Sequence, residues 1–337
     1  MSAPAVTIIE LADRADWNRA VVRGPALPTH RHAVIAAAAQ PLGGTAKLWC
    51  WHSPRGAATC AVITRPVPGG GFDLVTPIGF SGLAHTGDPS GLAAAWTASW
   101  RAEGAVAAYL QLHPFQSSEA WKVIWADIAP GLSTGPITYV WDLAPELDTL
   151  EGDLARDHKL RLRKWWKTNT ETVTDHEHLA ERFAELYTAF AQRKDVGSAY
   201  RMHHAVLHSV AADKGVLAVG ARTPNAPISA VSLFPHAGDR ADYYLNGASP
   251  EGRHHARGLV WTAMTMLRAR GVRWLNLGGG VRAGDSLDSF KRRFGARAVQ
   301  TQVLRHIIDP VAYARACAHR GVDPSDATGY FPAYRAP

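Results

Sequence analysis

A glycine turn after an apolar strand is the part of this sequence whose residue types could do chemistry. The run 272–277 is apolar, and it leads directly into three consecutive glycines at 278–280. Glycine lets a backbone adopt left-handed conformations and come close to a bound group. We therefore expect a ligand at this turn and assign Gly279 to substrate binding.

The residues after the turn predict a short helix that carries three cations. Asp285 or Ser286 can cap this helix, and apolar residues then recur at helical spacing through 287–294. The cations that leave the helix by its other faces are Lys291, Arg292 and Arg293. Positive charge thus gathers beside the glycine turn. The alternative is a strand, loop and solvated basic helix end of an ordinary α/β domain.

Composition describes a globular protein. The 337 residues are 47% hydrophobic and 19% charged, and this length favours about two domains. No signal-peptide pattern begins the chain, and no apolar run is long enough to span a membrane. We therefore expect a cytoplasmic monomer without membrane insertion. The net charge of +7 is compatible with a polyanionic partner.

Neither a metal site nor a hydrolase triad is indicated. The three cysteines follow no zinc or disulfide pattern. Close histidine pairs occur, but none has the i, i+4 spacing with an intervening glutamate of a metalloprotease helix. No Gly-x-Ser-x-Gly elbow is present. The sequence therefore predicts no metal and no cofactor.

The chain repeats one order of elements. In the first half, the predicted strands are 47–52, 57–66, 72–76, 105–113 and 137–143, with helices at 89–103 and 118–128. In the second half, the predicted strands are 215–221, 228–234, 241–246, 272–277 and 298–308, with helices at 254–270 and from 286. Both halves read as a meander of three strands, then helix, strand, helix and strand. This is the order of the GNAT acyltransferase fold.

The fold class expected from this repeat is α/β, with mixed sheets in two tandem GNAT-like domains at 1–143 and 144–337. A basic helix at 151–170 would join the two copies, and two further helices follow at 177–192 and 201–212. The cations of the joining helix stand around two tryptophans: Lys159, Arg161, Arg163, Lys164 and Lys167. Clustered cations with aromatic neighbours suit a nucleic-acid backbone. A solvated linker helix is the alternative.

Several of these features together resemble the Fem family of non-ribosomal peptidyltransferases, which take an aminoacyl group from aminoacyl-tRNA. The resemblance covers about 142–305, and its most specific piece is Phe-Lys-x-x-Phe-Gly at 290–295. The basic helix, Gln192-Arg193, the Tyr-Tyr-Leu-Asn-Gly run at 243–247 and the triple glycine also match. The chain has no long coiled-coil arm, so it is similar to the compact members. These act on peptidoglycan precursors or small peptidyl antibiotics.

The resemblance implies a role for each site residue. Lys291 would stabilise the oxyanion or contact the terminal RNA phosphate. Arg193, Tyr244 and Asn246 would bind the acceptor amine and its substituents. The cations of 151–170, with Arg292 and Arg293, would bind tRNA. Aminoacyl-tRNA would be the co-substrate, and Asp285 and Asp288 are the nearest candidate bases.

Two other functions stay open. An acyl-CoA-dependent N-acyltransferase would bind pyrophosphate at a helix N-terminus through Arg/Gln-x-x-Gly-x-Gly/Ala. The equivalent place here is 253–258, where Ala256 replaces the first glycine and crowds the close approach of the backbone. A non-catalytic RNA- or peptide-binding module is the remaining alternative.

Overall fold

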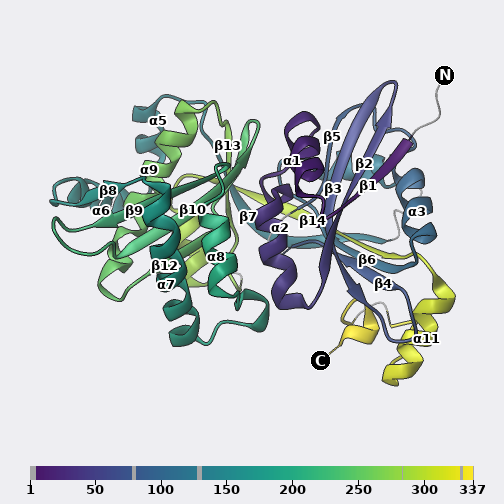
Figure 1. Cartoon of the computed structure of the whole chain (residues 1–337). Coiled ribbons are helices and arrows are strands. Elements are labelled where there is room, and N and C mark those ends of the chain that lie inside the picture. The colour runs from purple at the N-terminus through teal and green to yellow at the C-terminus, as the bar shows by residue number, and fades with distance from the viewer. Residues whose placement is uncertain (1–4, 78–80, 127–130, 283, 327–328, 337) are drawn as a thin grey trace. The chain divides into compact units, whose positions relative to one another are not determined.

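The computed structural model describes residues 5–77, 81–126, 131–282, 284–326 and 329–336, and contacts divide the chain into two compact units. The first unit comprises 1–26, 42–136 and 300–337, and the second comprises 27–41 and 137–299. Each unit combines a β-sheet with helices (Figure 1). The predicted mixed α/β class is therefore confirmed.

The first unit is built on the strand order β1-β2-β3-β4-β6-β14, with β5 paired to β3. The strands are β1 (Ala5–Glu10), β2 (Thr45–Ser53), β3 (Gly56–Pro66), β4 (Phe72–Val75), β5 (Gly82–Gly87), β6 (Ala105–Gln111) and β14 (Arg297–Ile307). The helices are α1 (Arg14–Arg23), α3 (Leu92–Ala102), α4 (Ser118–Ile124) and α11 (Pro310–Arg320). All neighbouring strands are antiparallel except β4 and β6, which are parallel. The predicted end of the α4 helix at residue 128 lies outside the described residues.

Tryptophan dominates the core of the first unit. The indoles of Trp96, Trp100 and Trp125 lie about 6 Å apart, centroid to centroid, and all three residues are fully buried. They pack against the apolar face of the sheet between α3 and α4. The other face packs against α11 and the C-terminal tail. This unit therefore has a core of its own.

The second unit is built on the strand order β7-β13-β11-β10-β9-β8, with β12 paired to β10. The strands are β7 (Leu132–Asp142), β8 (Glu171–Val173), β9 (Val216–Arg222), β10 (Ala230–Ala237), β11 (Arg240–Asp242), β12 (Leu245–Ala248) and β13 (Trp274–Gly278). The helices are α2 (His32–Ala39), α5 (Leu147–Asp153), α6 (Arg156–Trp166), α7 (His176–Lys194), α8 (His204–Ala211), α9 (Ala256–Ala269) and α10 (Ser286–Arg292).

Helices cover both faces of this second sheet (Figure 1). Residues of α2, α7 and α8 pack on one face. Residues of α5, α6 and α9 pack on the other, together with Phe294 just after α10. The strands are therefore buried on both sides, as expected for the long apolar runs of this half of the sequence.

The two sequence copies exchange their last strands. β7 ends the first copy, and its residues 139–142 pair with β13 of the second copy. β14 ends the second copy, and its residues 303–307 pair with β6 of the first. Both strands cross from one unit to the other, since β7 changes unit after Pro136 and β14 after Val299. The repeated order of elements is present, but each unit is completed by a strand from the other copy.

This exchange explains why the compact units differ from the predicted domains. The sequence places one boundary at 143, whereas the structure assigns 300–337 to the first unit and 27–41 to the second. The 27–41 segment is anchored by Arg31, whose Nε donates to the carbonyl oxygen of His236 over 2.8 Å and whose Nη1 lies 3.3 Å from Asp213. A boundary drawn by sequence order cannot separate interleaved segments.

Other local differences are smaller. The predicted strand 241–246 is divided into β11 and β12, and the basic segment 151–170 contains the end of α5 and all of α6 rather than one helix. β1, α1, α2, β5 and α11 were not predicted. Among the described residues, no helix is both long and apolar enough to cross a membrane.

Candidate functional site

The end of β13 is bent by an irregularity in its pairing with β7. Asn276 pairs with Val140, but Gly278 pairs with Tyr139, so the register shifts between them. Gly278 has φ +75°, a conformation that favours glycine. Such irregularities re-aim the chain at a strand end. Here the irregularity turns the glycine run away from the ladder and toward α10.

Lys291 is buried against this glycine turn. Its residue is 8% exposed, and its Nζ donates to the carbonyl oxygen of Gly279 over 2.6 Å. A Cβ at Gly278 would lie 2.8 Å from Nζ, and a Cβ at Gly279 would lie 2.3 Å from the carbonyl oxygen of Ile137. The absence of a side chain at Gly278 therefore leaves room for the Lys291 ammonium, and its absence at Gly279 leaves room for the backbone of β7. Lys291 and Gly279, which the sequence suggested separately as catalytic and substrate-binding residues, are therefore in direct contact.

Burial changes the acidity of this lysine. It lowers the pKa of Lys291 from 10.5 to about 8, and the negative charges of Asp285 and Asp288 partly oppose the shift. Desolvation disfavours the charged form of a group, which is why the pKa falls. Lys291 is therefore still mainly a cation at neutral pH, but it can lose its proton in mildly alkaline solution.

Asp285 shapes the loop before α10. It is the N-cap of α10: Oδ1 accepts from the backbone nitrogen of Asp288 over 2.7 Å, and Oδ2 from those of Val281 and Arg282 over 2.8 and 3.0 Å. These bonds favour the carboxylate and lower the pKa of Asp285. A carboxylate so engaged is a poor proton acceptor, so we assign Asp285 to the cap rather than to the base.

A buried network of hydrogen bonds lies next to the glycine turn. The Oδ1 atom of Asn276 accepts from the Thr138 hydroxyl over 2.7 Å and from the Gly278 nitrogen over 2.9 Å. Its Nδ2 atom donates to Oδ1 of Asp242 over 2.9 Å. Asp242 is 6% exposed, and burial raises its pKa to about 7. This network holds the Asn276 side chain in place, and Asn276 in turn holds the backbone at Gly278, next to the carbonyl oxygen that Lys291 binds.

Asp242, Asn276 and Thr138 were not expected at the site from the sequence. Their sequence signals are a carboxylate in the run Ala-Asp-Tyr-Tyr and an asparagine within the apolar run 272–277. A polar residue inside a buried strand usually has a partner. That partner lies on another strand, so spacing within one segment does not reveal it.

The predicted acceptor-binding residues lie on β12 and its neighbours. Nη2 of Arg193, near the end of α7, donates to the carbonyl oxygen of Ala248 over 3.1 Å. The hydroxyl of Tyr244 and Oδ1 of Asn246 are buried and have no hydrogen-bond partner among the described residues. Their side chains therefore offer unused polar atoms, but they are not in contact with Lys291. Burial raises the pKa of Tyr244, and the negative charge of Asp242 contributes to this shift.

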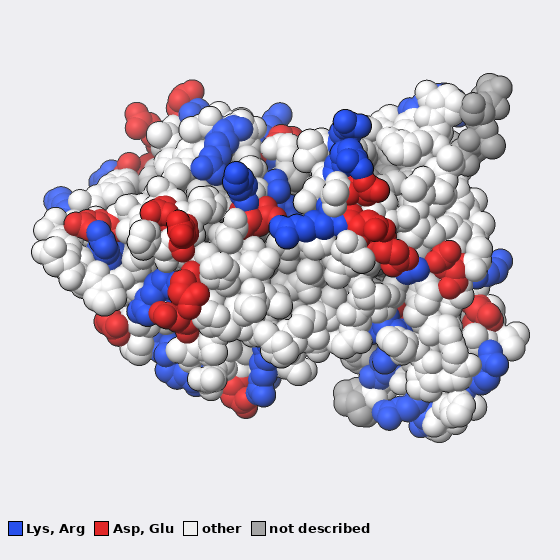
Figure 2. Space-filling model, viewed as in Figure 1, with Lys and Arg blue, Asp and Glu red and all other residues white. Residues whose placement is uncertain are grey.

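The cations of α6 have different surroundings. Nζ of Lys159 donates to the carbonyl oxygen of Gly152 over 3.0 Å, and Arg163 forms an ion pair with Glu151 over 2.7 Å. Arg161, Lys164 and Lys167 are exposed. On the face shown in Figure 2, lysine and arginine alternate with acidic residues, and no uninterrupted basic surface is visible there.

Of the two arginines at the end of α10, one forms an ion pair with another helix and one does not. Arg293 forms an ion pair with Asp157 over 2.7 Å, which ties the end of α10 to the first turn of α6. Arg292 is exposed near Tyr139. The structure therefore brings Arg293 and α6 together, while Arg292 stays on the surface.

The beginning of α9 is covered by a tryptophan. Trp165 donates from Nε1 to Nδ1 of His255 over 3.0 Å, and a Cβ at Gly258 would lie 2.3 Å from its ring. A 3₁₀ turn at 251–255 runs directly into the helix. The backbone at Gly258 is therefore packed against protein rather than open to a ligand.

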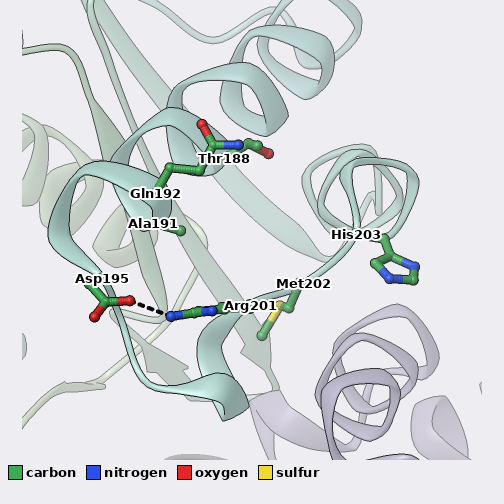
Figure 3. A pocket seen from close by; sticks show the side chains of 7 residues that line it. All are labelled: Thr188, Ala191, Gln192, Asp195, Arg201, Met202 and His203. Carbon is green, nitrogen blue, oxygen red and sulfur yellow. Dashed lines mark hydrogen bonds and ion pairs between the residues drawn. The ribbon is translucent and has the colours of Figure 1, made fainter.

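A separate pocket of ≈ 490 Å³ lies at the C-terminal end of α7 (Figure 3). Its lining residues are Thr188, Ala191, Gln192, Asp195, Arg201, Met202 and His203. An ion pair between Asp195 and Arg201 lies at this pocket. Lys291 does not line it. Within the described part of the chain, no group of three histidine, cysteine or acidic side chains could hold a metal ion.

This architecture is similar to those of several known proteins. Residues 155–292 match the model of an acetyltransferase (GNAT) domain. No curated protein sequence matches the chain. Among solved structures, FemX is similar with a TM-score of 0.66 and 13% identity, over 92% of this chain and 99% of that one.

Two further structures are similar. One is a conserved protein of unknown function from Bacteroides thetaiotaomicron, with a TM-score of 0.59 and 11% identity, over 90% of this chain and 100% of that one. The other is the C-terminal domain of a putative lysylphosphatidylglycerol synthetase from Agrobacterium fabrum. It has a TM-score of 0.55 and 16% identity, over 87% of this chain and 92% of that one.

These similarities confirm the predicted fold. The chain has a Fem-like tandem GNAT fold. At such low identities the likeness concerns the fold, and function must be argued from the site.

Proposed function

We propose that the protein transfers an aminoacyl group from aminoacyl-tRNA to the amine of a small peptidyl natural product or a peptidoglycan precursor. The observation that carries this proposal is the buried ammonium of Lys291, held 2.6 Å from the Gly279 carbonyl at the end of β13. This lysine belongs to the Phe-Lys-x-x-Phe-Gly motif at 290–295. The Fem-like fold supports the same reaction class.

The reaction needs positioning and charge stabilisation more than acid–base power. The acceptor nitrogen attacks the ester carbonyl, the C–N bond forms, and the C–O bond to the ribose breaks. The proton of the amine ends on the released ribose hydroxyl. Negative charge develops first on the carbonyl oxygen and then on the leaving oxygen. A preorganised cation in a dry site stabilises such charge strongly, and Lys291 has this role in our proposal.

The remaining residues hold substrate and lysine in place. Asn276 and Asp242 fix the backbone at Gly278 through the bonds described above. Arg193, Tyr244 and Asn246 bind the acceptor in this proposal, since the last two carry buried polar atoms without partners among the described residues.

Acyl-CoA-dependent N-acylation is the second candidate, favoured by the match of 155–292 to a GNAT domain. Two observations weigh against it. Ala256 stands where the pyrophosphate motif has glycine, and Trp165 covers the backbone at Gly258. Pyrophosphate binding at a helix N-terminus needs open backbone amides.

A direct test uses a pool of charged tRNA, cell extract as the source of acceptor amines, and mass analysis of the products. We expect an amine that gains an aminoacyl residue in an amide bond, and we expect ribonuclease pretreatment of the tRNA to abolish the product. Acetyl-CoA should not replace the tRNA. Acyl transfer from CoA that ribonuclease leaves unchanged would contradict the proposal.

The rate should depend on pH through Lys291. The cation is present below its pKa of about 8 and is lost above it, so turnover should fall as the pH rises through about 8. The measurement is kcat at saturating substrates across this range, corrected for spontaneous ester hydrolysis. In Lys291→Arg, whose guanidinium keeps its charge, the alkaline fall should disappear even if the rate is lower. If kcat still falls at alkaline pH in this variant, a group other than Lys291 causes the fall.

A further inference from the structure

We infer that Arg161, Arg257 and Arg293 form a binding site for a phosphate group of the acyl donor. The three arginines come from α6, α9 and α10, and all belong to the second unit. Arg257 was not identified as a functional residue from the sequence. The inference rests on the proposed function for the identity of the donor, but the phosphate site itself is argued from the arrangement of these side chains.

Arg257 is the centre of the cluster. Its guanidinium carbon lies 5.5 Å from the centroid of the Phe290 ring, and its Nε donates to Nδ1 of His158 over 3.4 Å. The stacking on Phe290 orients the planar guanidinium. Phe290 is the residue before Lys291, so Arg257 packs against the helix that carries the residue to which we assign catalysis.

The charges of the cluster are not balanced. Asp157 forms an ion pair with Arg293, whereas neither Arg161 nor Arg257 has an ion pair with a described residue. Burial lowers the pKa of Arg257, and repulsion from Arg161 lowers it further; Asp157 partly opposes this shift, and Arg293 adds to it. The carboxylate of Asp157 thus pairs with Arg293 and also attracts Arg257. Like charges held together in this way destabilise one another, and a bound anion would relieve the repulsion.

His158 does not supply the missing negative partner. Its side chain is 2% exposed, and burial followed by the charge of Arg257 lowers its pKa to about 4. The imidazole is therefore neutral at physiological pH, and its Nε2 has no hydrogen-bond partner among the described residues. The residue that contacts the Arg257 guanidinium is therefore a neutral ring rather than a carboxylate.

Phosphate is the anion that this arrangement fits. Guanidinium groups present planar forks of donors that match phosphate oxygens, and several arginines around one site are typical of phosphate recognition. The phosphate could come from the RNA backbone near the ester or from the diphosphate of CoA. Under the proposed function it is a phosphodiester near the 3′ end of the tRNA, with the ester reaching Lys291.

The test measures binding of an RNA hairpin that ends in the tRNA acceptor sequence, with CoA as a second ligand. Arg161→Ala and Arg257→Gln should each weaken hairpin binding by about 10-fold and reduce the log-log salt slope by about one unit. Arg161 is exposed, so its removal should leave the fold intact. Arg270→Ala is the matched control, because it removes an exposed cation at the opposite end of α9. We expect this control to bind as the wild type does.

Each outcome has a defined meaning. If both variants bind the hairpin as the Arg270→Ala control does, the phosphate site is wrong while the proposed function stands. If the wild type binds CoA but not the hairpin, and the variants weaken CoA binding, the site stands and the tRNA-dependent function fails. Binding of neither ligand by the wild type would overturn the site.

Discussion

Lys291→Ala should lower kcat by about 10²-fold or more while changing the binding of both substrates far less. The buried ammonium is proposed to act where charge develops, so its loss should raise the energy of the transition state more than that of the bound ground state. The fold should tolerate the change, because burying this cation already costs stability, as its lowered pKa indicates. The measurement is single-turnover transfer from a charged tRNA, with tRNA binding measured separately.

Arg292→Ala is the control for this prediction. It removes the same unit of charge from the next position of α10, but Arg292 is exposed whereas Lys291 is buried. Its effect should be small and should vanish at high salt, because exposed charges are screened. Near-normal turnover in Lys291→Ala together with a large loss in Arg292→Ala would mean that the Phe-Lys match is coincidental.

Local signals explain why part of this site could be predicted from the sequence. A cap residue, apolar residues at helical spacing and a glycine run are all encoded within about twenty consecutive residues. They predicted the cap of α10 at Asp285 or Ser286, and the structure has Asp285 there; they also predicted cations beside the glycine turn, where Lys291 binds the Gly279 carbonyl oxygen. The meander and helix order of each copy is also local, so the fold class was accessible from one sequence.

The rest of the site depends on contacts between distant segments. Asn276 bonds to Thr138 and Asp242, which lie on other strands. Arg257 meets α6 and α10 only because α9 packs beside them. No spacing within one segment encodes such neighbours, so these residues could not be assigned a role from the sequence.

The strand exchange was hidden for a related reason. The sequence patterns of β7 and β14 predict that each is a strand, but the apolar pattern of a strand does not specify which strand it pairs with. The apolar pattern of β7 is compatible with β6 or β13 as its hydrogen-bonded neighbour. The exchange with β14 is a property of the packed chain, and for this reason the compact units do not follow a boundary at 143.

Gly278→Ala should reduce turnover by about 10-fold to 10²-fold without touching a titratable or substrate-binding side chain. Gly278 has φ +75°, and a Cβ there would lie 2.8 Å from Nζ of Lys291. The flexible end of the lysine can move aside, so the fold should survive, but the ammonium would leave its place at the Gly279 carbonyl. Displacement of a catalytic group by about 1 Å can cost a factor of about 10² in rate.

Gly284→Ala separates this effect from backbone strain. Gly284 lies in the same loop and also has φ +75°, but no described atom lies within 4 Å of the Cβ that would be added. Both variants should therefore lose a similar free energy of unfolding, about 1–2 kcal/mol for a left-handed alanine. Only Gly278→Ala should also lose turnover and shift the alkaline limb of the pH profile. Equal turnover in the two variants, at equal stability, would show that the position of the Lys291 ammonium does not limit the reaction.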